Sequence, residues 1–96
     1  MTGRDAAIPG DTIPRLPRGV RLRYEERRGE WMLLAPERVL KPDGIAIEIL
    51  KRCDGQASLD AIIDSLAEQF QADRIEVARD VREFVSELAA KRMLEL

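Results

Sequence analysis

The sequence offers few side chains that could do chemistry. Histidine is absent, which excludes a His-based triad, a histidine general base and a histidine-ligated metal. The only cysteine, Cys53, excludes an internal disulfide and a cysteine-rich zinc site. It falls on the apolar face of a predicted helix, and no histidine is present to activate its thiol. We therefore expect a buried structural cysteine rather than a nucleophile.

Two groupings of carboxylates are close enough in the chain to be inspected as acid–base pairs. Glu25 and Glu26 are adjacent on a predicted strand, so they point to opposite faces unless the turn folds them together. Asp43 and Glu48 form the second grouping. Solvated surface charge is the interpretation we favour for all of them, since carboxylates are mostly exposed. With no glycine-rich phosphate loop either, we expect no catalytic residue, no metal site and no cofactor: a binding module, not an enzyme.

The composition describes one soluble domain. The chain has 96 residues, of which 45% are hydrophobic and 35% charged, and its formal net charge is -2. This weak acidity gives no general attraction to nucleic acid or to an anionic membrane. No apolar run approaches the roughly 20 residues of a membrane span, and the first ten residues lack the apolar stretch of a signal peptide. We expect a cytoplasmic protein with no membrane partner.

The elements that must position any binding surface begin after a proline-rich start. Residues 1–18 are expected to form a flexible arm, because prolines and glycines leave no periodicity there, and residues 19–96 form the domain. On this interpretation residues 1–13 are dispensable. The alternative is docking on the domain through three apolar side chains: Ile8, Ile13 and Leu16.

Three short strands are predicted over residues 20–25, 31–34 and 38–40. The first alternates apolar with charged residues, the pattern of a half-buried strand. The second is apolar on both faces, so we expect it to be covered on both. An antiparallel meander with the second strand in the centre leaves the first and third strands as edges.

The third strand is the more inviting edge. It consists of Arg38, Val39 and Leu40, and its free backbone groups could accept an extended peptide as an additional strand. Two alternatives stay open: brevity alone protects this edge, or a second copy of the chain pairs there. The arginines that alternate along the first strand blunt the other edge.

Three helices follow. Pro42 is expected in the first turn of the first helix, and Ser58 is a suitable N-cap for the second. Asp73 and Glu76 have the spacing of a capping box at the start of the third. The apolar face of that third helix consists of Val77, Val81, Phe84, Val85 and Leu88. Residues 93–96 could add a final extended piece.

Three antiparallel strands followed by three helices are the parts of a small α+β domain of the winged helix-turn-helix type. A DNA-reading member would need a basic recognition helix, but the predicted second helix carries acidic residues and no Lys or Arg. No nucleic-acid partner is therefore expected. An acidic protein or peptide could be attracted by the arginines of the strand half, although a solvated strand face is the simpler explanation. These are Arg15, Arg18, Arg21, Arg23, Arg27 and Arg28.

One stretch resembles a known family. The sequence Leu34-Ala35-Pro36-Glu37-Arg38-Val39-Leu40, followed by an apolar helix ending Cys53-Asp54-Gly55, resembles the PqqD family of pyrroloquinoline quinone (PQQ) biosynthesis proteins. The Arg-Gly-Val-Arg-Leu-Arg run at 18–23, the Trp31 strand and the Asp54-Gly55-Gln56-Ala57-Ser58 connection are similar to that family too. The resemblance covers residues 14–96.

The resemblance implies a peptide chaperone. PqqD proteins are recognition elements for a ribosomally synthesised and modified peptide (RiPP): they bind the precursor peptide PqqA and present it to the radical SAM enzyme PqqE. PqqE then cross-links a glutamate and a tyrosine of PqqA. The competing hypothesis is a non-catalytic winged-helix scaffold or a dimerisation module, and a homodimer is possible in either case.

The resemblance also implies a site. In related domains the peptide adds to the third strand, with its apolar side chains against the third helix. Core packing is the simpler role for the valines of that helix. The peptide-binding residues carried over by position are Arg38, Val39, Leu40, Val77, Val81, Arg82 and Val85.

Overall fold

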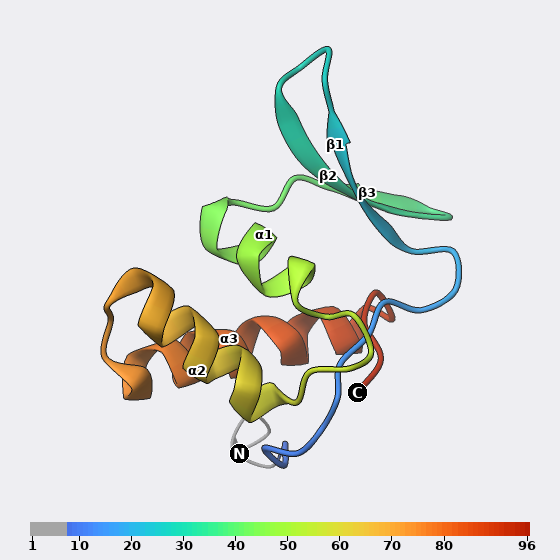
Figure 1. Cartoon of the computed structure of the whole chain (residues 1–96). Coiled ribbons are helices and arrows are strands. Elements are labelled where there is room, and N and C mark those ends of the chain that lie inside the picture. The colour runs from blue at the N-terminus through green and yellow to red at the C-terminus, as the bar shows by residue number, and fades with distance from the viewer. Residues whose placement is uncertain (1–7) are drawn as a thin grey trace.

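A computed structural model describes residues 8–96, in which a small sheet lies on one side of the helices (Figure 1). The expected α+β order, three antiparallel strands followed by three helices, is confirmed. No helix within this part of the chain is long and apolar enough to cross a membrane. The elements are β1 (Arg21–Glu25), β2 (Glu30–Ala35), β3 (Arg38–Leu40), α1 (Gly44–Lys51), α2 (Leu59–Phe70) and α3 (Arg74–Ala90).

The sheet is the predicted meander, with β2 between β1 and β3. Leu33 of β2 lies opposite Leu22 on one side and Leu40 on the other, and this row faces the helices, because Leu33 is buried and its neighbours pack against the core. The next row carries Leu34 and Val39 on the outer face. Leu34 stays partly exposed, so the expectation that β2 is covered on both faces is wrong.

Aspartate or serine caps the start of each helix. The Asp43 carboxylate accepts a hydrogen bond from the Ala46 N–H at 3.0 Å, so Asp43 is the N-cap of α1 and Pro42 precedes the helix instead of lying in its first turn. Ser58 caps α2 as predicted. Asp73 caps α3, but its carboxylate accepts from the N–H of Ile75, not from that of Glu76 as a capping box requires.

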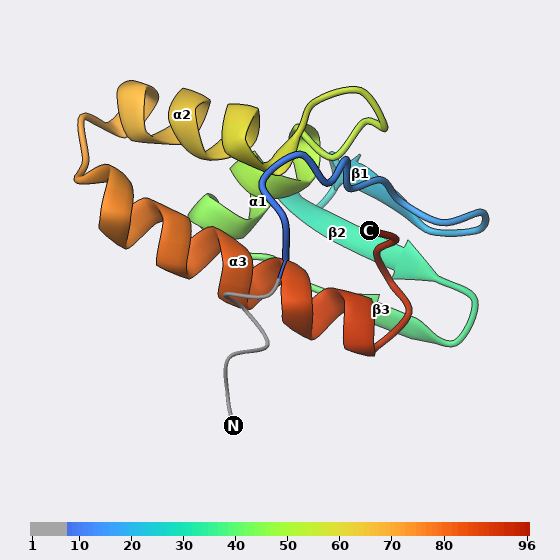
Figure 2. The same ribbon diagram turned by 90° about the horizontal axis from the view of Figure 1, so that it is seen from below.

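The hydrophobic core fills the space between the sheet and the three helices. α2 and α3 form an antiparallel pair (Figure 2). α1 packs on α2 and lies between this pair and the sheet (Figure 1). Such burial supplies the main driving force for folding. The largest fully buried side chains are Leu33, Ile49, Leu59, Ile62, Ile63, Leu66, Met93, Val81, Val85 and Pro14.

The segment before β1 packs against the domain, so the expected flexible arm is wrong for residues 8–18. The Thr12 carbonyl accepts from the N–H of Leu59 at 2.7 Å, and the Gly10 carbonyl accepts from the N–H of Asp60 at 2.9 Å. These donors belong to the first turn of α2, where no carbonyl of the helix itself can reach them. Residues 1–7 of the predicted arm lie outside the described residues.

The docking alternative describes this segment better. Ile8 and Leu16 pack against the core, whereas Ile13 is 46% exposed. The segment also pairs with the end of the chain: the backbones of Arg15 and Glu95 exchange hydrogen bonds of 3.0 and 2.8 Å, and their side chains form an ion pair of 2.9 Å. The extended piece predicted for residues 93–96 is thus a single β-bridge, between Glu95 and Arg15.

Candidate functional site

β3 is an open edge with a groove beside it. Among residues 8–96, no strand pairs with its outer side, and its backbone makes no hydrogen bonds outside the sheet. The adjacent cavity of about 310 Å³, here called the β3–α3 groove, lies between the end of β3, the start of α1 and one side of α3. Its lining residues are Leu33, Leu40, Lys41, Pro42, Asp43, Ile45, Ala46, Ile49, Leu50, Asp80, Phe84, Glu87, Leu88 and Lys91.

The groove is apolar at its floor and charged at its rim. Its floor belongs to the hydrophobic core, since Leu33, Ile49, Leu50 and Leu88 are at most 3% exposed. Ile45, which is 40% exposed, and Phe84 form the apolar walls. The rim carries both signs of charge: Lys41, Lys91, Asp43, Asp80 and Glu87. Such a surface suits the apolar side chains of an extended segment.

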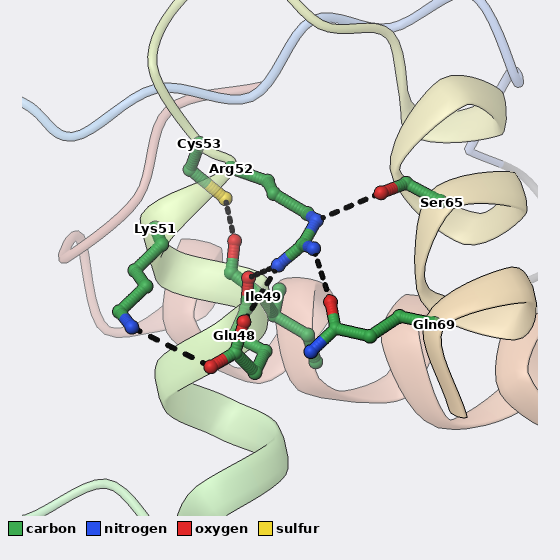
Figure 3. A network of polar contacts seen from close by, with 7 residues as sticks. All are labelled: Glu48, Ile49, Lys51, Arg52, Cys53, Ser65 and Gln69. Atoms are coloured by element: carbon green, nitrogen blue, oxygen red, sulfur yellow. Dashed lines mark hydrogen bonds and ion pairs between the residues drawn. The ribbon is translucent and has the colours of Figure 1, made fainter.

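A network of polar contacts centred on Arg52 fixes α1, which supplies one wall (Figure 3). Its guanidinium donates to the backbone carbonyl and the carboxylate of Glu48, both at 2.9 Å. On the other side it donates to Ser65 at 3.1 Å and to Gln69 at 2.5 Å, both on α2. The hydrogen bond from Arg52 is the main cause of the lowered pKa of Glu48. The network therefore joins the last turn of α1 to α2.

Three of the groups inspected for catalysis, Cys53, Asp43 and Glu48, have structural roles. Cys53 is 4% exposed, as expected, and donates to the Ile49 carbonyl at 3.2 Å. Its burial raises the pKa of the thiol to about 12, so the thiol is neutral at physiological pH. Asp43 caps α1 and Glu48 binds Arg52. Residues 8–96 hold no group of three or more Cys, Asp or Glu side chains placed to bind a metal ion.

The three predicted strand residues divide between the two faces of the sheet. Leu40 lines the groove. Arg38 lies opposite Ala35, two positions from Leu40 along β3, and so has the same orientation toward the helix side. Val39 is 56% exposed on the outer face, so its side chain can contact a strand added at β3 only on the face away from the groove.

The predicted helix residues are not groove residues. Val77, Val81 and Val85 are 8%, 0% and 0% exposed and belong to the core, the role noted as the simpler one. Arg82 donates to the Ile8 carbonyl and lies 3.9 Å from Asp60, on the side of the N-terminal segment. The structure places none of these four residues in the lining of the groove, and their contact with a peptide stays a prediction.

A different side of α3 faces the groove. It presents Asp80, Phe84, Glu87, Leu88 and Lys91, which recur at intervals of three and four residues and so share one helix face. The sequence held a signal for this second face. Phe84 and Val85 are adjacent, about 100° apart around the helix, which indicates an apolar arc wide enough to contact two partners.

Comparisons with known proteins agree with this geometry. The family model described as coenzyme PQQ synthesis protein D (PqqD) matches residues 30–94. A relative from Rhodopseudomonas palustris (strain BisB5), named PqqA binding protein, is 48% identical over 94 residues, covering 98% of this chain and 92% of the relative. A protein of the same name from Rhizobium meliloti (strain 1021) is 46% identical over 96 residues, covering 100% of this chain and 98% of the relative.

Two solved structures are similar. One is the solution structure of the PqqD truncation of Methylobacterium extorquens PqqCD, described as a functional and stand-alone RiPP recognition element. It is 40% identical, with a TM-score of 0.79, and the match covers 96% of this chain and 98% of that chain. The other, PqqD from Xanthomonas campestris, is 44% identical, with a TM-score of 0.59 and coverage of 94% and 100%. The resemblance found in the sequence is confirmed: this chain belongs to the PqqD family.

Proposed function

We propose that this protein is a peptide chaperone of PQQ biosynthesis, which binds the precursor peptide PqqA and presents it to the radical SAM enzyme PqqE. The observation that carries the proposal is the outer edge of β3, which no strand within residues 8–96 pairs, directly beside an apolar groove. Support comes from the relatives named PqqA binding protein and from the similar structure described as a RiPP recognition element.

The peptide binds as a fourth strand on β3. Backbone hydrogen bonds to Arg38–Leu40 contribute affinity with little demand on sequence, and pockets for alternate side chains select the partner. Each hydrogen bond is worth about 0.5–1.5 kcal/mol. An apolar side chain buried against Ile45 and Phe84 adds about 1.5–3 kcal/mol. A few such contacts give a reversible complex, as a presenting protein requires.

The protein contributes position, and PqqE contributes the chemistry. The Cys53 thiol packs in the core, the Asp43 carboxylate caps α1, and the Glu48 carboxylate pairs with Arg52. A peptide held by this protein while it contacts the enzyme is delivered at a high effective concentration. We expect no change in the mass of PqqA with this protein alone, and faster modification when it is added to PqqE. Modification without PqqE would contradict the non-catalytic role.

Titration of the ¹⁵N-labelled protein with PqqA tests the binding site. Amide signals of β3, of the start of α1 and of the groove side of α3 are expected to shift. Those of β1, on the opposite edge of the sheet, should stay in place. Shifts confined to β1, or no shifts at all, would rule out this site.

A further inference from the structure

A second hollow continues the line of the β3–α3 groove and is basic. It measures about 400 Å³ and lies at the other end of β3; we call it the basic pocket. Four of its lining residues are cationic and one is anionic. In residues 8–96, none of these five forms an ion pair. The lining consists of Pro17, Arg18, Val20, Ala35, Pro36, Glu37, Arg38, Lys91, Arg92 and Met93.

The two hollows lie on the same side of the sheet. Arg38 lines the basic pocket and Leu40 lines the groove; they are two positions apart on β3, so their side chains point to the same face. Lys91 at the end of α3 lines both hollows. A strand added to β3 therefore passes the apolar hollow and the basic one in turn. The distance from Arg38 to Leu40 along the strand is about 7 Å.

We propose that the basic pocket binds a carboxylate side chain of the extended peptide and thereby sets the direction in which the peptide lies. The acidic side chain lies at the Arg38 end, and an apolar side chain lies at the Phe84 end. Both must point to the same side of the added strand, so they are separated by an even number of positions, two or four. The inference rests on the proposed function, since it specifies which side chains of the peptide are recognised at the same edge of the sheet.

The end of α3 alone does not explain this group of cations. Lys91 and Arg92 follow α3, where positive charge complements the helix dipole. Arg18 and Arg38 come instead from the segment before β1 and from β3, yet they meet the other two at one hollow. The floor contains Val20 and Met93, which are 9% and 1% exposed. An apolar floor limits the water beneath a bound carboxylate and strengthens its attraction to the arginines.

A double-mutant cycle tests the proposal. The carboxylates of PqqA are replaced one at a time by amides, and each peptide is titrated against the native protein and against Arg38→Gln. For one carboxylate we expect the amide to weaken binding to the native protein three- to tenfold, and to weaken binding to Arg38→Gln by less than twofold. Arg21→Gln is the matched control, because Arg21 is an exposed strand arginine on the outer face of the sheet.

A second arm tests the spacing. Moving the coupled acidic residue by one position along PqqA should cost as much affinity as the amide, because its side chain then points to the opposite face of the added strand. If no carboxylate couples to Arg38 while Ile45→Asp in the groove still weakens binding, the basic pocket is not a subsite and the proposed function stands. If the native protein fails to bind PqqA, the proposed function itself is wrong.

Discussion

Ile45 is the residue at which binding can be changed with the least effect on folding. It is 40% exposed on the groove wall and is the second residue of α1, where a carboxylate is favourable to the helix dipole. Ile45→Asp should therefore keep the fold, but it places a charge where the proposed complex has an apolar contact with the peptide. We expect at least tenfold weaker binding of PqqA by calorimetry, equal to about 1.4 kcal/mol.

The chain holds a matched control for this variant. Ile75 is also the second residue of an aspartate-capped helix, is 76% exposed and does not line the groove. Ile75→Asp should bind PqqA as the native protein does. Equal losses in the two variants would show that the effect of Ile45→Asp is not local to the groove.

The pairing of Glu48 with Arg52 predicts a pH dependence of stability. Because the pKa of Glu48 is lowered from 4.5 in the folded state, the pair stabilises the fold fully above that value, and the contribution disappears as pH falls through the lower folded pKa. Both side chains are mostly buried, at 23% and 24% exposure. Arg52→Met should lower the free energy of unfolding by about 1–3 kcal/mol at pH 7.

Urea unfolding at pH 7 and pH 3 checks this. The difference in free energy of unfolding between native protein and Arg52→Met should narrow at pH 3, because below pH 4.5 Glu48 gains its proton more readily in the unfolded chain than in the folded native protein. A gap of the same size at the two pH values would assign the effect to the contacts with Ser65 and Gln69 alone. Arg74→Met removes ion pairs that are far more exposed, so it should lower the free energy of unfolding by less than Arg52→Met does.

At the scale of elements, the two edges of the sheet make an internal comparison. In the proposed complex PqqA forms new hydrogen bonds to β3 and none to β1, which lies on the opposite edge of the sheet. Amide hydrogen exchange of Arg38–Leu40 should slow in the complex, while exchange of Arg21–Glu25 stays within about twofold. Slower exchange on β1 instead would move the peptide to the other edge.

The N-terminal segment is an element that stabilises α2, which reverses the expectation that residues 1–13 are dispensable. A chain starting at Pro14 loses the carbonyls of Gly10 and Thr12, and leaves two N–H groups at the start of α2 without their partners. Its free energy of unfolding should fall by about 1–3 kcal/mol relative to a chain starting at Ile8, which keeps both. Equal urea midpoints for the two chains would contradict this role.

In this molecule, local sequence patterns predicted the helices and strands better than they predicted the contacts between them. Alternation in residues 20–25 and capping residues such as Ser58 act over a few positions, so they can be found in the sequence. The groove side of α3 could not be found that way, because an apolar arc does not reveal which part meets the core. Docking of residues 8–18 depends in part on carbonyl acceptors, which every residue type possesses, and only its apolar contacts, such as that of Leu16, could be suggested from side-chain type.

For the same reason, the sequence predicted the β3 edge but not the side of α3 that faces the groove. The strand order followed from the meander, so the β3 edge could be predicted before any contact was known. Val81 could not be separated from Phe84 by hydrophobicity, since both are apolar residues of α3. Only the packing of α2 on one side of α3 decides that Val81 is enclosed and that Phe84 faces the groove.

The floor of the groove is built from the same residues as the core, which limits how this domain can acquire a new partner during evolution or by engineering. A change at Leu33 or Leu88 would alter stability together with recognition, because both side chains are almost fully enclosed. Positions such as Ile45, Asp80 and Lys91 surround the floor without supporting it. New specificity can therefore arise through these surrounding positions while the scaffold stays intact, and a library designed to retarget the domain should vary them first.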